Sequence, residues 1–362
     1  MGLTDYRTLG RSGLRVSPLC LGAMTFGEQW GFGTDEAGSV RQLDLYEAGG
    51  GNFIDAANIY TKGHSERILG DWLAAGGASR RDRTVLATKF GGSMHRGDPN
   101  AGGSGRVAIM RACEASLRRL RTDRIDLYWV HFWDDFTPLE ELMRSLDLLV
   151  QQGKVRYVGF SDHPAWVCAR AQSIAEFRGW TPLAAIQIEW SLLQRTVERE
   201  LVPMARELGM GVCPWSPLRG GVLTGKFTRA GRQTTEETRV RDDSKHLHER
   251  TYDLIDAMKE IADAHACTVP QVAIAWLDAQ PGCTSTILGA RTAAQLEDTL
   301  ASLEVALTPE QLARLDELTA PPDHFPQTFL EAVRTTMLNG ARIDGIEGPI
   351  WDLSPADDSE RA

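Results

Sequence analysis

The chain has 362 residues, of which 42% are hydrophobic and 24% are charged, a composition typical of a globular protein with a sizeable core. Its 39 basic and 49 acidic residues give a net charge of −10, which argues against nucleic acid or an anionic membrane as the main partner. No segment has the length of a membrane span, and the N-terminal residues lack a secretion-signal pattern. The six scattered cysteines indicate buried thiols in a reducing compartment, so we expect a cytoplasmic protein.

In chain order, residues 6–18 predict a small β-hairpin around Gly13. Short apolar, β-branched segments then alternate with longer segments of helical period. The predicted strands are residues 18–24, 52–57, 83–90, 125–132, 154–161, 183–191, 210–216 and 284–290. The predicted helices include residues 39–49, 65–75, 107–120, 139–153, 197–209 and 269–280, and another begins near Tyr252.

Near-continuous apolar strands indicate a parallel sheet that is buried on both faces. Eight β/α units in this length predict a closed (β/α)₈ TIM barrel over residues 1–320, with the N-terminal hairpin before it. A doubly wound sheet is the alternative, but no Gly-x-Gly-x-x-Gly follows the first strand. We expect residues 91–105 and 229–250 to form long functional loops at the carboxyl face, and residues 321–362 to form an irregular acidic tail.

A barrel places its chemistry where its strands end. The second predicted strand supplies Asp55, with Tyr60 in the loop beyond it, and the next two strands end at Lys89 and His131. Each residue alone has a structural interpretation, such as a turn cap or a core histidine. Together, a lysine cation lowers the pKa of a neighbouring phenol, an aspartate holds the lysine, and a histidine orients a carbonyl oxygen. The set predicts a proton-donating site for a carbonyl that receives a hydride.

Six segments, in chain order, resemble segments of the aldo-keto reductase superfamily, nearer the branch that includes the potassium-channel β subunits. They are residues 53–73, 86–90, 126–134, 153–162, 214–227 and 288–300. The resemblance implies that Tyr60 is the general acid, that Lys89 tunes it, that Asp55 holds Lys89 and that His131 orients the substrate. It also implies that the hydride comes from a nicotinamide cofactor, because no side chain can supply one.

The resemblance also implies a cofactor site across the barrel mouth. Its nicotinamide end would involve Gly22, Ala23, Met24, Asp55, Ser161, Asp162, Gln187 and Trp215. The diphosphate would lie against Ser216, Pro217, Leu218, Arg219, Gly220 and Lys226, and the adenosine against Gly289, Arg291, Gln295 and Asp298. An arginine can grip a 2′-phosphate, so Arg291 favours NADP (NADPH) over NAD. Asp162 stands where the family usually has asparagine, which adds a negative charge near the nicotinamide and favours the oxidised cofactor slightly.

For the substrate, we expect contacts from Tyr60, His131, Trp30 and Trp133, and consider Trp190 as a further wall of the pocket. Core packing is an equal interpretation of the tryptophans. We predict no metal site, because His246 and His248 have a metal-like spacing but lack a third ligand.

Two hypotheses for the function follow. The first is an NADP(H)-dependent enzyme that reduces small aldehydes or ketones, or oxidises the corresponding alcohols. The second is a dinucleotide-sensing regulatory subunit with incidental turnover, like the potassium-channel β subunits. The intact set of Asp55, Tyr60, Lys89 and His131 favours the enzyme. A metal-dependent barrel hydrolase would need ligand pairs at the strand ends, which are lacking. The sequence specifies neither the natural substrate, the direction, nor the oligomeric state.

Overall fold

The computed structural model describes residues 1–232, 244–322 and 325–361. The chain divides into two compact units, Met1–Thr319 and Ala320–Ala362. The first unit contains an eight-stranded parallel sheet in the order β12-β3-β4-β5-β6-β7-β8-β9. These strands are β3 (Leu19–Gly22), β4 (Phe53–Asp55), β5 (Val85–Phe90), β6 (Ile125–Val130), β7 (Val155–Ser161), β8 (Leu183–Glu189), β9 (Gly211–Trp215) and β12 (Thr286–Leu288).

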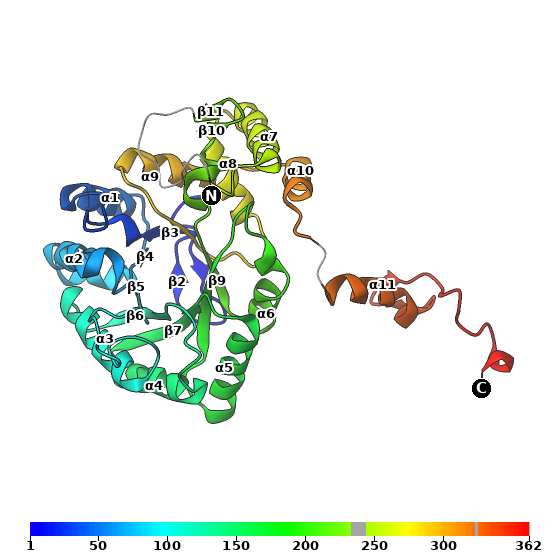
Figure 1. Ribbon diagram of the computed structural model, residues 1–362, viewed down its shortest axis with the longest axis horizontal. Helices are drawn as coiled ribbons and strands as arrows, with labels where there is room; N and C mark the ends of the chain where they lie inside the picture. The colour runs from blue at the N-terminus through cyan, green and yellow to red at the C-terminus, as the bar shows by residue number, and fades with distance from the viewer. Residues whose placement is uncertain (233–243, 323–324, 362) are drawn as a thin grey trace. The chain divides into compact units, whose positions relative to one another are not determined.

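The sheet closes between β9 and β12. Val212 forms a parallel bridge with Cys283, and the Thr284 amide donates a hydrogen bond to the Val212 carbonyl at 2.8 Å. Helices surround the strands in chain order (Figure 1): α1 (Glu36–Ala48), α2 (His64–Arg83), α3 (Arg106–Arg119), α4 (Leu139–Gln151), α5 (Ala165–Arg178), α6 (Leu201–Glu207), α7 (Glu249–His265), α8 (Val269–Asp278), α9 (Ala293–Leu300) and α10 (Pro309–Thr319). The predicted (β/α)₈ barrel is therefore confirmed.

The N-terminal hairpin is also present. Strands β1 (Arg7–Thr8) and β2 (Arg15–Val16) pair antiparallel. Leu9 and Val16 are fully buried and join the apolar cluster of the barrel interior. In that interior the ring of Trp129 lies against Gly159, where an added Cβ would come within 2.4 Å of the ring. Only glycine fits at this position, because the tryptophan occupies the space that a side chain would need.

Capping side chains explain where several helices begin. Asp35 caps α1 by accepting a hydrogen bond from the Gly38 amide at 2.6 Å. Thr268 and Gln271 form a capping box at the start of α8, and Thr292 caps α9 by accepting from the Gln295 amide. Each cap satisfies backbone N–H groups that the first helical turn leaves without a partner.

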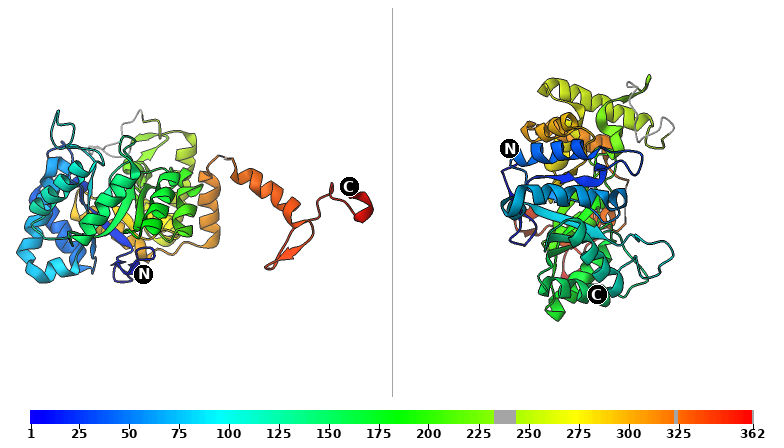
Figure 2. Two further views of the ribbon diagram at one scale, coloured as in Figure 1. Left: turned by 90° about the horizontal axis from the view of Figure 1, so that it is seen from below. Right: turned by 90° about the vertical axis from the view of Figure 1, so that its left-hand side faces the viewer.

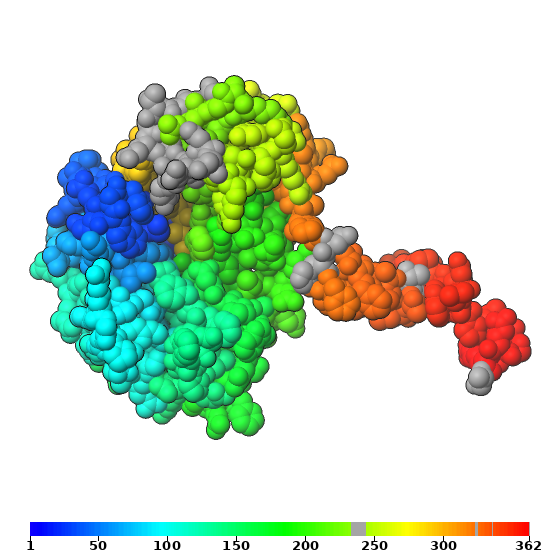
Figure 3. All heavy atoms as spheres, in the orientation of Figure 1, coloured from blue at the N-terminus to red at the C-terminus, as the bar shows by residue number. Residues whose placement is uncertain are grey.

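Long loops lie at the carboxyl ends of the strands. The base of loop 91–105 is closed by a hydrogen bond from the Gly103 amide to the Gly91 carbonyl at 2.8 Å. The predicted loop 229–250 falls partly outside the described residues. Its described part includes β11 (Gly231–Arg232), paired with β10 (Phe227–Thr228), and the first turn of α7. The side views show α7 and α8 next to each other (Figure 2), and in the space-filling view the successive barrel segments form one closely packed surface (Figure 3).

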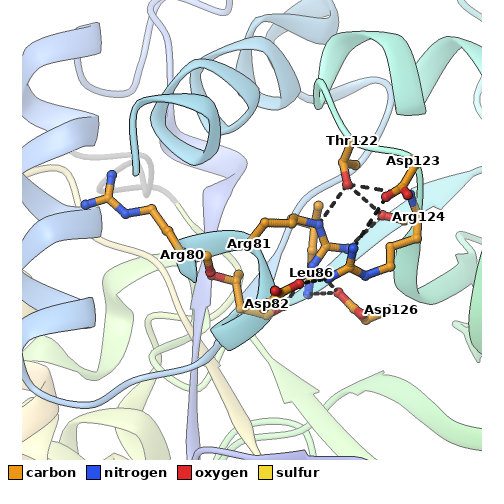
Figure 4. A network of polar contacts seen from close by, with 9 residues as sticks. Arg80, Arg81, Asp82, Leu86, Thr122, Asp123, Arg124 and Asp126 are labelled. Carbon is orange, nitrogen blue, oxygen red and sulfur yellow. Dashed lines mark hydrogen bonds and ion pairs between the residues drawn. The ribbon is translucent and has the colours of Figure 1, made fainter. Parts of the chain in front are cut away.

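A polar cluster lies at the opposite, amino-terminal ends of β5 and β6 (Figure 4). The buried guanidinium of Arg81, at the end of α2, forms an ion pair with Asp126 at 2.9 Å. It also donates hydrogen bonds to the hydroxyl of Thr122 and to the carbonyls of Thr84 and Arg124. Asp126 accepts a further hydrogen bond from the Leu86 amide. The cluster joins one helix end to the starts of two strands.

The second unit, taken by itself, contains α11 (Gln327–Leu338) and an antiparallel pair, β13 (Arg342–Ile343) and β14 (Ile346–Glu347). The prediction of an irregular tail is therefore wrong for α11 and for the β13–β14 pair. In α11, Phe329, Val333 and Met337 recur every four residues, a spacing that suits an amphipathic helix. In the part of the chain that the structure describes, no helix is long and apolar enough to cross a membrane.

Candidate active site

Lys89 is the centre of the site at the carboxyl face. Its side chain is fully buried near the end of β5. The ammonium group forms an ion pair with Asp55, the last residue of the neighbouring strand β4. It also donates hydrogen bonds to the carbonyl of Ala56 at 3.0 Å and to the hydroxyl of Tyr60 at 2.9 Å. Asp55, Lys89 and Tyr60 are thus in direct contact.

This arrangement sets the direction of the hydrogen bond between Lys89 and Tyr60. A lysine ammonium has three N–H donors, and here they are directed at Asp55, Ala56 and Tyr60. The Tyr60 oxygen therefore accepts from Lys89, and its own hydrogen can be donated to another group. Because Tyr60 is only partly buried, that group can approach from the barrel mouth.

The charges of the three groups depend on one another. Burial alone would lower the pKa of Lys89, but Asp55 and Tyr60 raise it above its usual value. Burial raises the pKa of Asp55, and Lys89 opposes that shift. Burial also raises the pKa of Tyr60, although the charge of Lys89 acts to lower it. The sequence correctly predicted that Lys89 acts to lower the pKa of Tyr60. Burial raises this pKa by more, so Tyr60 stays protonated at neutral pH.

His131 follows the last residue of β6. Its ring lies edge-on to Tyr60, with 5.8 Å between ring centroids, and stacks on Phe132 at 4.7 Å. Burial and the charge of Lys89 lower the pKa of His131 to about 3. The imidazole is therefore neutral at physiological pH and has one N–H to donate, which suits the orientation of a carbonyl oxygen beside Tyr60.

Two amide side chains hold these groups in place. Gln187 of β8 donates to the second carboxylate oxygen of Asp55 at 3.1 Å. Asn58 is buried between Asp55 and Tyr60 in the chain. Its backbone N–H donates to the Lys89 carbonyl at 3.0 Å, and its side-chain amide donates to the Gly92 carbonyl at 3.3 Å. Together they tie the loop that carries Tyr60 to the ends of the adjacent strands.

The tryptophans that were considered for the substrate pocket lie in different environments. Trp30 contacts Tyr60 edge-on, with ring centroids 6.1 Å apart. Trp133 is 42% exposed and contacts Trp166. Trp190 is buried, with its indole N–H donated to Glu198 at 2.8 Å. Trp190 therefore belongs to the core, and the idea that it walls a pocket is wrong.

At the nicotinamide end that the resemblance implies, several side chains form hydrogen bonds with one another. Asp162 accepts hydrogen bonds from Trp215 Nε1 at 3.0 Å and from the Ser161 hydroxyl at 3.1 Å. The surrounding protein removes part of the hydration of the Asp162 carboxylate, although the residue still contacts solvent. This partial desolvation raises the pKa of Asp162 to about 6, and the hydrogen bonds from Trp215 and Ser161 oppose the shift. Next to it, the buried His163 donates a hydrogen bond from Nδ1 to the Ser161 carbonyl at 2.7 Å.

Gly22 ends β3, and Ala23 and Met24 begin the short turn that follows it. A Cβ at Gly22 would lie 2.8 Å from the side chain of Ile287, so the position needs glycine for close packing between β3 and β12. The Ala23 carbonyl accepts a hydrogen bond from the Ser65 hydroxyl at 2.7 Å, and Met24 is half-buried.

The loop after β9 has the backbone of an anion site. Ser216, Arg219, Gly220 and Gly221 have positive φ angles of 57°, 47°, 64° and 105°, and such turns direct successive N–H groups toward one concave side. Residues 216–226 contain Arg219 and Lys226 but no carboxylate. The Lys226 ammonium lies 3.1 Å from the place of a Cβ on Gly221. Arg219 itself forms an ion pair with Glu189. Pro217 is buried and Leu218 packs on the core.

The residues that the resemblance places at the adenosine end differ in how open they are. Gly289 is exposed, and a Cβ there would meet nothing within 4 Å, so its backbone is open to a ligand. The Arg291 amide donates to Gln295 at 3.0 Å. Asp298, in contrast, accepts hydrogen bonds from Thr268 and Gln271 and so supports the start of α8. The bare backbone at Gly289 and the carboxylate-free loop 216–226 fit a dinucleotide, whereas Asp298 is already occupied by protein partners.

Within the described residues, no group of three or more His, Cys, Asp or Glu side chains could hold a metal ion. His246 and His248 lie in the described segment just before α7.

Several site residues were not found from the sequence. Glu189 is at the end of a predicted strand and would have been found by a search for any carboxylate there. His163 follows Asp162 directly but has no spacing signal. Trp166, in the first turn of α5, was missed because α5 itself was not among the predicted helices.

Known proteins are similar to this chain over most of its length. The sequence model of the Aldo/keto reductase family matches residues 18–320. The chain belongs to this family.

It is 41% identical over 325 residues to the uncharacterized oxidoreductase YrpG of Bacillus subtilis, covering 87% of this chain and 95% of the relative. It is 36% identical to the aryl-alcohol dehydrogenase [NADP(+)] of Phanerodontia chrysosporium (84% of this chain, 83% of the relative). It is also 35% identical to norsolorinic acid reductase A of Aspergillus parasiticus (96% and 89%). The resemblance seen in the sequence is therefore confirmed, and the protein is an oxidoreductase of the aldo/keto reductase family.

Proposed function

We propose that the protein catalyses the NADP(H)-dependent reduction of aldehyde or ketone carbonyls to alcohols, or the reverse oxidation. The observation that carries the proposal is the set of hydrogen bonds around Lys89. It leaves the hydrogen of Tyr60 available at the mouth of the barrel, beside the neutral His131.

In the reduction, the hydride for the carbonyl carbon would come from the nicotinamide of a bound NADPH. Tyr60 donates its proton to the carbonyl oxygen, so that the C=O bond becomes a C–OH single bond with no net change of charge on the substrate. The Lys89 cation stabilises the phenolate that forms, and Asp55 keeps the ammonium in position. His131 orients the carbonyl oxygen with its N–H. Solvent then restores the proton of Tyr60, and in alcohol oxidation Tyr60 acts as the base.

The choice of NADP is supported by Arg291 at the adenosine end and by the relative whose name includes NADP(+). We propose contacts to the nicotinamide end from Ser161, Asp162, Gln187 and Trp215, and to the diphosphate from the loop 216–226. Asp298 is a weaker candidate, because it already accepts from Thr268 and Gln271.

The test is the Tyr60→Phe variant. It removes the proton donor while keeping the ring, and general acid catalysis is typically worth ~10²–10⁴ in rate. We expect the NADPH-dependent reduction of simple aldehydes to fall by this factor, while the dissociation constant of NADPH, followed by tryptophan quenching, stays near that of the wild type.

A variant that reduces aldehydes at the wild-type rate would remove Tyr60 from its proposed role. A wild-type protein that binds NADPH but turns over no aldehyde, ketone or alcohol would instead favour the dinucleotide-sensing function.

A further inference from the structure

An aromatic surface extends outward from the catalytic residues. Phe132, Trp133 and Trp166 are 41%, 42% and 58% exposed, although large aromatic side chains in folded proteins bury most of their area. Phe132 stacks on the catalytic His131 at 4.7 Å. Trp133 is two residues beyond His131, a chain length of at most about 7 Å, and contacts Trp166 edge-to-face with 5.6 Å between centroids and 86° between ring planes.

The surface is held rigidly from below. Asp134, next to Trp133, accepts hydrogen bonds from the Ser104 amide, the Phe136 amide and the Thr137 hydroxyl, at 2.7, 2.9 and 2.7 Å. Trp166 is in the first turn of α5, and Arg170 one turn later forms an ion pair with Glu140 of α4 at 2.8 Å. These contacts order the backbone that carries the two tryptophans, and the rings also contact each other. Preorganised contacts lose less free energy on binding.

Resting on the proposed function, we infer that Trp133 and Trp166 form an outer binding site for the second ring of an extended aryl carbonyl substrate. The first ring and the carbonyl lie against Trp30, Tyr60 and His131. The second ring stacks on the exposed face of one indole and contacts the other with its edge, because the two indole planes are nearly perpendicular. It replaces water on both indoles. The chemical class is a biaryl or fused-ring aldehyde or ketone, in contrast to an aliphatic or single-ring one.

The experiment compares kcat/KM for 4-biphenylcarboxaldehyde and benzaldehyde, which share the reacting group and differ by one ring. In the wild type we expect the biphenyl compound to be preferred. Trp166→Ala should lower its kcat/KM by about 10- to 200-fold, the range for a lost apolar contact in a substrate pocket, with benzaldehyde changed by no more than about twofold. Trp166→Phe should restore most of the preference, because it returns an aromatic face.

Phe177→Ala is the matched control. Phe177 is an exposed aromatic residue at the other end of the same helix, about 16 Å along its axis from Trp166. It should leave both substrates unaffected. Equal losses for the two aldehydes in Trp166→Ala, or the same loss in Phe177→Ala, would overturn the inference.

Binding of the alcohol product separates this inference from the proposed function. Calorimetric titration with 4-biphenylmethanol needs no turnover and should show weaker binding to Trp166→Ala than to the wild type or Phe177→Ala. If no carbonyl is reduced but this difference is found, the proposed function fails and the outer site stands. If carbonyls are reduced without any biphenyl preference and the titrations agree, the outer site fails and the function stands.

Discussion

Two ion pairs with buried cations lie at opposite ends of the barrel. At the carboxyl end, Lys89 pairs with Asp55; at the amino end, Arg81 pairs with Asp126. Both connect neighbouring β/α units. They differ in what the remaining donors contact: those of Arg81 are taken by a hydroxyl and two backbone carbonyls (Figure 4), whereas one donor of Lys89 goes to Tyr60 at the open mouth.

The pKa shifts of the two buried cations also differ. Burial lowers the pKa of Arg81 and Asp126 only partly compensates, whereas Asp55 and Tyr60 raise the pKa of Lys89 despite its burial. An arginine remains charged in either case. The comparison indicates that the amino-end cluster joins elements together, and that the carboxyl-end cluster holds a charge next to a group that can exchange a proton. Barrel enzymes generally divide stability and chemistry between these two ends.

The largest effect is expected for Lys89→Met. The change keeps the volume but leaves the Asp55 carboxylate buried without its cation, which typically costs ~3–5 kcal/mol, and it removes the charge beside Tyr60. Carbonyl reduction should fall at least as far as in Tyr60→Phe, and the melting temperature should fall as well. Without Lys89 the folded-state pKa of Asp55 rises further, so the stability deficit should grow as the pH rises and shrink in acid.

Lys154→Met is its control, because Lys154 forms an ion pair with Glu114 in which both side chains remain partly exposed. Such pairs are worth about 0–1 kcal/mol. A melting temperature of Lys89→Met equal to that of Lys154→Met would show that Asp55 and Lys89 do not depend on each other as the structure indicates.

Arg81→Met tests the other end of the comparison. Its loss leaves the Asp126 carboxylate buried without its cation, with the Leu86 amide as a remaining donor, and removes a donor from two backbone carbonyls. Because the pair keeps a little solvent contact, we expect a cost near the lower end of the ~3–5 kcal/mol typical of broken buried pairs. Urea unfolding should show this loss, while kcat per folded molecule stays at the wild-type value. Arg121→Met, which breaks an exposed ion pair with Asp71, should change neither. A fall in kcat comparable with that of Lys89→Met would end the distinction between the two clusters.

The two clusters also differ in how far the sequence predicts them. The carboxyl end was predictable because strand period locates where each strand ends, and β4, β7 and β9 end at the predicted Asp55, Ser161 and Trp215. The amino-end cluster was not. Arg80, Arg81 and Arg83 all end a helical segment, and nothing local marks Arg81 as the buried one. Its burial depends on how α2 packs on the starts of β5 and β6, which is tertiary information.

The same reason explains the partners that were missed within the site. The family resemblance implied Arg219 as a diphosphate contact, but its ion pair with Glu189 joins residues that only the adjacency of β8 and β9 brings together. The resemblance also implied Asp298 as an adenosine contact, yet its partners Thr268 and Gln271 form the start of α8. Local pattern locates a residue on an element, and packing decides what it contacts.

Cofactor choice provides a smaller effect at the carboxyl end. Hydrogen bonds to charged groups are worth about 1.5–3 kcal/mol, so Arg291→Ala should weaken NADPH binding by about tenfold to a hundredfold. NADH lacks the 2′-phosphate and should be affected far less, and the stability of the barrel should not change. Dissociation constants of both cofactors in both proteins test this. Equal losses for the two cofactors would show that Arg291 does not contact the phosphate.

The smallest effect concerns the pH dependence that Asp162 gives to the carboxyl end. Desolvation by the surrounding protein raises the pKa of Asp162 to about 6, so in the folded protein this residue is protonated well below that pH and ionised well above it. Because the folded-state pKa is raised above its usual value, the stability linked to this proton is present in acid and is lost as the pH rises through about 6.

The carboxylate that forms lies beside the region proposed for the nicotinamide, which is cationic only when oxidised. The ratio of the NADP⁺ and NADPH dissociation constants should therefore fall as the pH rises from 5 to 7.5, by about twofold to fivefold, since exposed charge pairs interact weakly. His131, with a pKa of about 3, should add no step in this range. Asp162→Asn carries no charge at any of these pH values, so its ratio should stay constant; a step near pH 6 that persists in this variant would assign the titration to another group.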